Sequence, residues 1–131
     1  AGDVSIAGKL TVKDIEVSNL TINGHIVTSG SKPNVIAGSA SGQASSVSID
    51  GNDTSGTITI VAGTNPTAGE MVRVEFVGGF NKKPKVIITS QDDNSASLQT
   101  YAKPSVNSFT LGTNTKPSNA TTYSYSYLVI E

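Results

Sequence analysis

Short apolar pairs recur at a nearly fixed step through the first thirty residues, and this repeat limits the possible fold more than any other feature. Pair starts are six, five, five and then six residues apart. In each of the first four pairs one residue separates the two apolar members, which is the spacing of a strand rather than a helix. Turn formers stand between the pairs, at Ala7-Gly8, Lys13-Asp14, Ser18-Asn19 and Asn23-Gly24. The pairs are Val4/Ile6, Leu10/Val12, Ile15/Val17, Leu20/Ile22 and the looser Ile26/Val27.

A chain that turns a corner after every two inward side chains predicts a β-repeat stalk over residues 1–30. Each apolar side chain contributes at most about 3 kcal/mol when buried, whereas fixing each backbone residue costs about 1–2 kcal/mol. A single stalk therefore cannot fold alone, and we expect intertwined copies, three around an axis. The alternative is that these residues form ordinary strands of the following domain. The side chains expected to drive oligomerisation are Val4, Ile6, Leu10, Val12, Ile15, Val17, Leu20, Ile22 and Ile26.

The composition favours an all-β chain. Of the 131 residues only 15% are charged, the formal net charge is −1, and no basic stripe is present, which argues against nucleic-acid binding. Thirteen glycines and many serines and threonines indicate frequent turns, and no stretch has a helical period. Cysteine is absent, so disulfides and thiolate chemistry are excluded. The abrupt start inside a repeat suggests the C-terminal part of a longer protein.

Strand signals become dense after a small polar connector at residues 28–33. A first short strand is expected from residue 34, then further strands at 47–49, 56–62, 71–76, 84–89, 97–102, 108–111 and 123–130. Turn sequences separate them, which predicts an antiparallel, jelly-roll-like β-sandwich. We therefore expect three parts: the stalk at 1–30, a linker with the first head strand at 31–46, and the sandwich head at 47–131.

Alternation within the expected strands assigns side chains to the core of the head. Apolar residues at every second position are expected to point inward. The predicted core contains Ile58, Ile60, Val72, Val74, Phe76, Val86, Ile88, Leu98, Phe109, Leu111, Leu128 and Ile130.

Several stretches of the head look familiar. They are GNDTSGTITI at residues 51–60, AGTNPTAG at 62–69, PKVIIT at 84–89 and the terminal YSYLVIE at 125–131. They resemble the C-terminal β-sandwich tip of phage tail-fibre proteins and fibre-like bacterial surface proteins. LTINGHIVTSG at 20–30 is similar to the repetitive β region that precedes such tips. The resemblance implies homotrimers, an extracellular or virion location and binding of surface partners, and it brings no catalytic residues.

Three tyrosines alternate with serines near the C-terminus. Tyr123, Tyr125 and Tyr127 therefore share one face of the last expected strand. An exposed row of this kind could stack on sugar rings. Alternatively, the tyrosines pack across strands or line a seam between subunits.

Two kinds of residue are candidates for ion binding. Asp92 and Asp93 form an oxygen-rich loop with Asn94, and a second such loop follows Asp50. Such loops could hold calcium, but both are also good turn sequences. His25 is the only histidine, and a threefold axis could gather three copies of it around a metal or an anion; otherwise its ring faces solvent.

No constellation of catalytic side chains is recognisable, so we expect no enzyme and no cofactor. The sequence predicts a structural and adhesive fibre-tip module, homotrimeric and located at a cell surface or on a virion, that binds a surface glycan or protein receptor. Neither nucleic acid nor membrane insertion is expected. Two alternatives remain: a filament or pilus-like subunit that assembles by strand addition, and a standalone carbohydrate-binding module.

Overall fold

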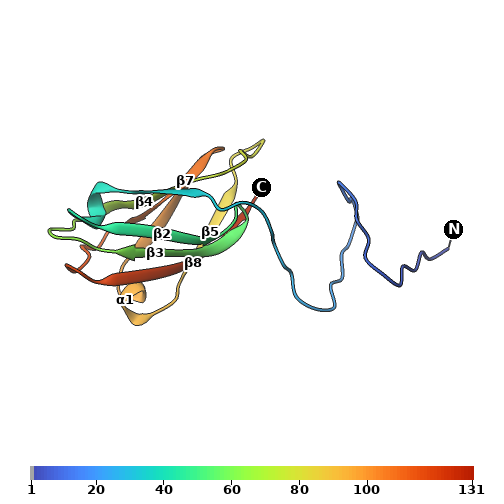
Figure 1. Cartoon of the computed structure of the whole chain (residues 1–131), viewed down its shortest axis with the longest axis horizontal. Coiled ribbons are helices and arrows are strands. Elements are labelled where there is room, and N and C mark those ends of the chain that lie inside the picture. The colour runs from blue at the N-terminus through green and yellow to red at the C-terminus, as the bar shows by residue number, and fades with distance from the viewer. Residues whose placement is uncertain (1) are drawn as a thin grey trace.

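The computed structural model describes residues 2–131, and all of its strands lie between Asn34 and Ile130. The strands form a two-layered head, and residues 2–33 leave one end of it as an arm (Figure 1). One sheet has the order β1-β4-β7-β6 and the other β2-β3-β8-β5, with every pair antiparallel. The predicted all-β sandwich is therefore confirmed.

Each stretch expected to be a strand overlaps one in the structure, although the bounds differ by up to three residues. The first sheet consists of β1 (Asn34–Ala37), β4 (Gly69–Glu75), β7 (Ser108–Thr113) and β6 (Thr100–Pro104). The second consists of β2 (Ser46–Gly51), β3 (Ser55–Val61), β8 (Thr122–Ile130) and β5 (Lys85–Ser90). A 3-10 turn, η1 (Ser39–Ser41), follows β1, and one helical turn, α1 (Asp93–Ala96), precedes β6.

The strands trace two successive Greek keys. Strand β1 pairs with β4 and β2 pairs with β3, while β1 also contacts β2 at a corner between the sheets. The first four strands thus have the spatial order 4-1-2-3 of a Greek key. Strands β5 to β8 repeat this order, because β8 pairs with β5, β6 pairs with β7, and β5 contacts β6. Each edge strand of one sheet (β1 and β6) therefore contacts an edge strand of the other (β2 and β5).

The core between the sheets contains most of the predicted residues, but two were assigned to the wrong face. Leu128 and Ile130 point to solvent, and Val129 is buried in their place. The reason lies earlier on β8, where Tyr123, Tyr125 and Tyr127 are buried. Because side chains alternate along a strand, the burial of the odd positions forces even positions outward.

A β-bulge in β4 places Met71 in the core. The register with β7 shifts between Glu70 and Val72. Met71 and Val72 are therefore both fully buried, although they are adjacent in sequence. Met71, which simple alternation would place on the face opposite Val72 and Val74, is part of the core.

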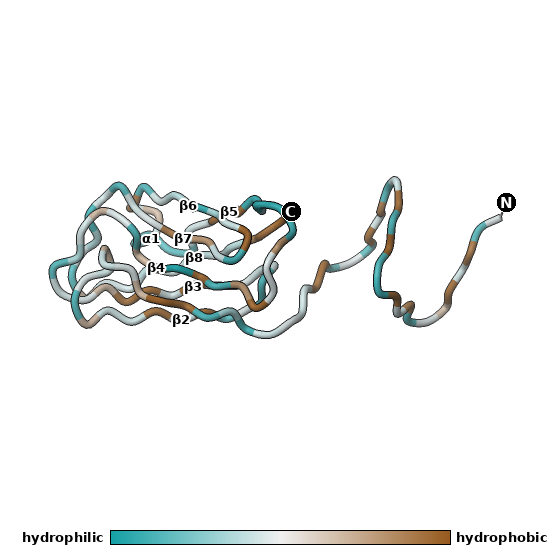
Figure 2. The backbone as a smooth tube through the Cα atoms, turned by 90° about the horizontal axis from the view of Figure 1, so that it is seen from above, coloured by the Kyte–Doolittle hydropathy of each residue, from teal (hydrophilic) through white to brown (hydrophobic). Residues whose placement is uncertain are grey.

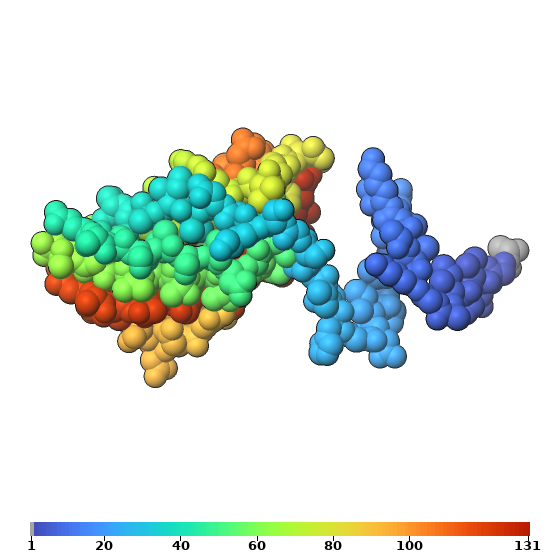
Figure 3. Space-filling view, viewed as in Figure 1, coloured from blue at the N-terminus to red at the C-terminus, as the bar shows by residue number. Residues whose placement is uncertain are grey.

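The arm contains no strand or helix among residues 2–33, and no backbone hydrogen bond joins two residues of this segment. Apolar and polar stretches alternate along its length (Figure 2). The space-filling view shows residues of the arm standing clear of the head for most of its length (Figure 3). Within a single chain, the predicted β-repeat stalk is therefore not formed.

Candidate interaction surfaces

The arm exposes every one of the apolar side chains expected to drive oligomerisation. Their exposed fractions range from 47% at Ile22 to 87% at Val4. Ordinary monomers expose single apolar residues but rarely a contiguous series of this size. Within one chain none of these side chains is buried.

The bends of the arm fall where turn residues were expected. The chain bends at Ala7 and Gly8, at Lys13, at Ser18 and at Asn23-Gly24. Gly24 has φ of 150°, in the region that favours glycine. The straight segments between bends coincide with the apolar pairs. Bends therefore separate the apolar pairs at the expected positions, but no backbone hydrogen bonds join the segments to one another.

Thr28, near the C-terminal end of the arm, connects the arm to the head. Its Oγ1 accepts a hydrogen bond from Asn52 Nδ2 at 3.0 Å and lies 2.6 Å from Ser55 Oγ. Asn52 is itself fixed, because its Oδ1 accepts from the backbone N–H groups of Thr54 and Ser55. The β2–β3 hairpin turn is thus the attachment point of the arm.

The tyrosine row is buried between the sheets, which excludes it as an exposed sugar platform. Each hydroxyl finds a backbone partner: Tyr125 donates to the Ser95 carbonyl at 3.2 Å, Tyr127 donates to the Asn52 carbonyl at 2.5 Å, and Tyr123 accepts from the Ser118 N–H at 2.8 Å. Burial raises the pKa of Tyr127 to about 12 and raises that of Tyr125 further. The tyrosines are packing residues of the head.

The position of Tyr127 explains why residue 56 is a glycine. Gly56 lies directly opposite Tyr127 in the β3–β8 pair. A Cβ at position 56 would come within 2.7 Å of the Tyr127 hydroxyl and still closer to the Asp50 carbonyl. A side chain at this position is therefore incompatible with the buried phenol.

The acidic residues proposed as metal ligands have structural roles. Asp92 caps α1, since its Oδ1 accepts from both the N–H and the hydroxyl of Ser95 at 2.7 Å. These hydrogen bonds hold the pKa of Asp92 below its usual value. Asp93 follows it in the first turn of α1. Across residues 2–131, no group of three His, Cys, Asp or Glu side chains is placed to hold a metal ion.

The acidic side chain of the second loop, Asp53, also accepts hydrogen bonds from the backbone. The carboxylate of Asp53 accepts hydrogen bonds from the N–H groups of Val77 and Gly78, both at 2.8 Å. It ties the β2–β3 turn to the segment after β4. His25 lies on the exposed arm, and the ion site expected from three copies of it stays a prediction.

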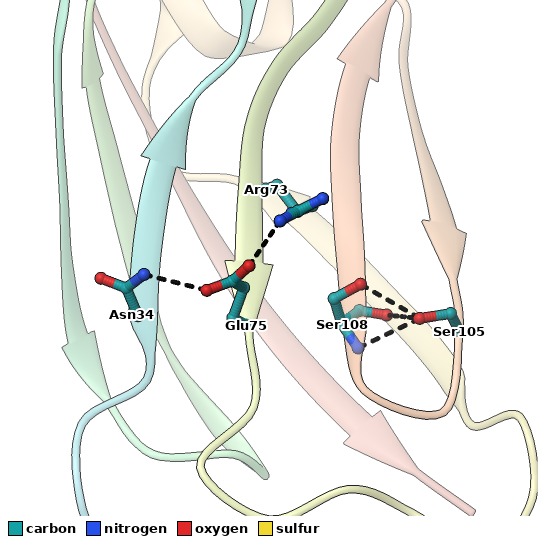
Figure 4. Close-up of polar contacts among 5 residues, drawn as sticks. All are labelled: Asn34, Arg73, Glu75, Ser105 and Ser108. Carbon is teal, nitrogen blue, oxygen red and sulfur yellow. Dashed lines mark hydrogen bonds and ion pairs between the residues drawn. The ribbon is translucent and has the colours of Figure 1, made fainter.

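The outer face of the β1-β4-β7-β6 sheet is charged. Glu75 accepts from Asn34 Nδ2 at 3.0 Å and forms an ion pair with Arg73, its neighbour on the same face of β4 (Figure 4). The hydrogen bond from Asn34 and the pairing with Arg73 lower the pKa of Glu75. Lys103 and Glu70 form a longer pair at 3.8 Å.

An open groove of about 480 Å³ lies beside this ion pair. Arg73 and Glu75 contribute to it from β4, and Asn107 and Ser108 from the β6–β7 turn and the start of β7. Ser105 and Ser108 bond to each other across this turn, which fixes its shape (Figure 4). Phe76 lines the groove and packs on Phe80. This polar groove was missed because its residues come from separate strands.

The outer face of the β2-β3-β8-β5 sheet has a different composition. Its middle rows carry hydroxyl side chains, and charged residues occur only on the edge strands, at Asp50 and Lys85. One corner is apolar and consists of Ile87, Leu128 and Ile130. The hydroxyl-bearing residues are Ser46, Ser48, Ser55, Thr57, Thr59, Thr89, Thr122, Ser124 and Ser126.

Among residues 2–131, no helix has the length and apolar character needed to cross a bilayer. No known protein family, curated protein or solved structure matches the chain. Arguments about function therefore start from the geometry of the arm and of the two outer faces.

Proposed function

We propose that this chain is a non-catalytic fibre-tip module in which the arms of three copies intertwine into a β-repeat stalk and display three heads to a surface ligand. The observation that carries the proposal is the contrast between a head with a closed apolar core and an arm whose apolar side chains are all exposed. The location that suits this role is the outside of a cell or virion.

Two properties of the arm support assembly with other copies. Its apolar pairs repeat with bends between them, so every segment presents the same kind of edge. Its backbone groups also have no partners within the segment. Strands from other copies would bury the side chains and satisfy the N–H and C=O groups at the same time.

A second candidate is a filament in which the arm of one copy adds to a sheet edge of the next. The extended, unpaired backbone of the arm favours it. The corner contacts of β1 with β2 and of β5 with β6 count against it, because they flank the sheet edges of the head.

The mass of the full chain in solution separates these candidates. The proposal expects a closed assembly of three 13.4-kDa chains whose mass does not change on dilution. Polymers that lengthen with concentration would favour the filament, and a stable monomer would contradict both. A deletion of residues 1–27 keeps Thr28 on Asn52 and Ser55, so the shortened chain should be a monomer with an unchanged β spectrum.

For the ligand, the groove beside Arg73 is the best-supported surface of the head. It combines the Arg73–Glu75 ion pair, the amide side chain of Asn107 and the side chain of Phe76, which suits hydroxyl-rich molecules such as glycans. A glycan array probed with the intact assembly tests this proposal. Arg73→Ala should abolish a positive signal, whereas Lys103→Ala, on the same outer face, should retain it. Loss of signal in both variants would contradict the groove as the specific site.

A further inference from the structure

The apolar corner formed by Ile87, Leu128 and Ile130 is a continuous surface. Ile87 and Leu128 lie directly opposite each other in the β5–β8 pair, and Ile130 is the next outward residue of β8. Their exposed fractions are 54%, 37% and 49%. Three large aliphatic side chains thus meet at one corner of a face whose middle carries mostly hydroxyl groups.

This corner adjoins the attachment point of the arm. Leu128 pairs across the sheet with Ser55, and Ser55 is the residue that Thr28 contacts at 2.6 Å. One row of the sheet therefore runs from the end of the arm through Ser55 and Leu128 to Ile87. The apolar series of the arm ends at Ile26 and Val27, directly before Thr28 in the sequence.

Charge distinguishes this face from the opposite one. The outer face of the β1-β4-β7-β6 sheet carries Glu70, Arg73, Glu75 and Lys103. On the β2-β3-β8-β5 face the two middle strands carry no charge, and the charged residues are Asp50 on β2 and Lys85 on β5, which pairs with Ile130 at the border of the corner. Depletion of charge is the compositional mark of the core of a protein–protein interface. On this face only the middle strands β3 and β8, next to the corner, have this composition.

We propose that the Ile87/Leu128/Ile130 corner packs against the same corner of another copy of this chain, so that the heads of the assembly meet beside the stalk. The inference rests on the proposed bundling of the arms. Three partly exposed side chains offer far less than the roughly 800 Å² per partner of a standard stable interface. The contact therefore forms only when the arms hold the heads at an effective concentration on the order of millimolar.

This packing orients the head. With the hydroxyl-rich face turned toward the other copies, the charged face and its groove beside Arg73 point outward. The three grooves of an assembly would then be open to a ligand at the same time.

Cysteine crosslinking of the full chain tests the contact, since the chain has no cysteine of its own. Leu128→Cys places a thiol at the centre of the corner. Ser124→Cys is the matched control, because it lies on the same outward face of β8, about 13 Å along the strand. With a short bis-maleimide, we expect covalent dimers from Leu128→Cys at least tenfold faster than from Ser124→Cys, at a rate that dilution does not change.

The possible failures are distinguishable. If the wild-type chain forms three-copy assemblies but both variants crosslink equally, this inference is wrong and the proposed function stands. If the wild-type chain is a monomer, both fail. Ile130→Cys serves as a second probe if Leu128→Cys unfolds the head, since its side chain is more exposed; slow crosslinking of Ile130→Cys within a three-copy assembly would also overturn the contact.

Discussion

The arm and the head use the same kind of sequence with opposite results. Both consist of apolar residues at alternate positions separated by turn formers. In the head, Ile58, Ile60 and Val74 are fully buried, whereas in the arm Val12 and Ile15 are more than half exposed. The difference is that each strand of the head faces a second sheet of the same chain. A segment of the arm, with its two apolar side chains, faces no sheet.

This comparison teaches that alternation specifies a face but not its partner. A sheet face must be covered by a second layer, and the head supplies that layer through its two Greek keys. The arm has no second layer within its own chain, and we propose that other copies supply it. Stability of the head should therefore be a property of one chain, and order in the arm should depend on assembly.

Changing an inward residue of the arm should have the largest effect. Val12→Asp would place a charge from each copy into the apolar edge of the stalk, where an unpaired charge is strongly unfavourable. We expect the three-copy assembly to dissociate into monomers while the β spectrum of the head is retained, as measured by light scattering and circular dichroism. Thr11→Asp is the control, because Thr11 alternates away from that edge and should leave the mass unchanged. Equal masses for the two variants would break the comparison.

Truncating a core tyrosine tests whether the head is stable independently of the arm. Tyr125 is fully buried, and Tyr125→Ala should lower the free energy of unfolding of the head by about 3–5 kcal/mol, as for other large aromatic truncations. Tyr125→Phe should cost about 1 kcal/mol, since only the hydrogen bond to the Ser95 carbonyl is lost. Denaturant melts of the 28–131 segment and of the full chain should show the same losses. A loss confined to the full chain would mean that the arm contributes to the core.

Much of the head could be predicted from the sequence, because its strands are short, alternating and separated by turn residues. The error at Leu128 and Ile130 arose from treating aliphatic residues as more suited to burial than tyrosines. The fold buries the rings because each phenol reaches a backbone partner, such as the Asn52 carbonyl for Tyr127. Consistent use of the Tyr-Ser alternation would have placed both residues outward and revealed the apolar corner.

The candidate surfaces were less predictable than the strands. The groove beside Arg73 depends on which strands become neighbours, and along the chain β4 and β7 are separated by β5 of the other sheet and by β6. The capping role of Asp92 is local, and the pattern Asp92-Asp93-Asn94-Ser95 carries its signal, because an N-cap carboxylate bonds to the residue three positions on. The oxygen-rich composition that suggested calcium is the same composition that forms caps and turns.

The junction between the two regions should show a smaller effect. Thr28→Val removes the contacts with Asn52 and Ser55 but keeps the shape of the side chain. We expect a loss of about 1–2 kcal/mol in the free energy that holds residues 28–33 against the head, since a hydrogen bond contributes about 0.5–1.5 kcal/mol. Faster amide hydrogen exchange at Thr54 and Ser55 would report it, with Ser29→Ala as the control. Unchanged exchange at these amides would show that Thr28 does not fasten the arm.

Acid should affect the head through Asp92, and this is the smallest effect expected. Its pKa in the folded chain is lowered from the ordinary value of 3.8 by hydrogen bonds from the Ser95 N–H and hydroxyl. A lowered pKa means that the stabilisation is present above pH 3.8 and is lost as the pH falls through the lower folded-state value. Asp92→Asn keeps a capping oxygen but cannot titrate, so its melting temperature should fall less steeply with acid than that of the wild type. Glu75, whose pKa is also lowered, accounts for part of the acid dependence that remains, and Glu75→Gln should reduce that part.

Because both carboxylates lie in the head, deletion of residues 1–27 should leave these acid profiles unchanged. An acid dependence that disappears with the arm would instead place the titrating groups in the stalk, and the head would no longer be the independently stable region.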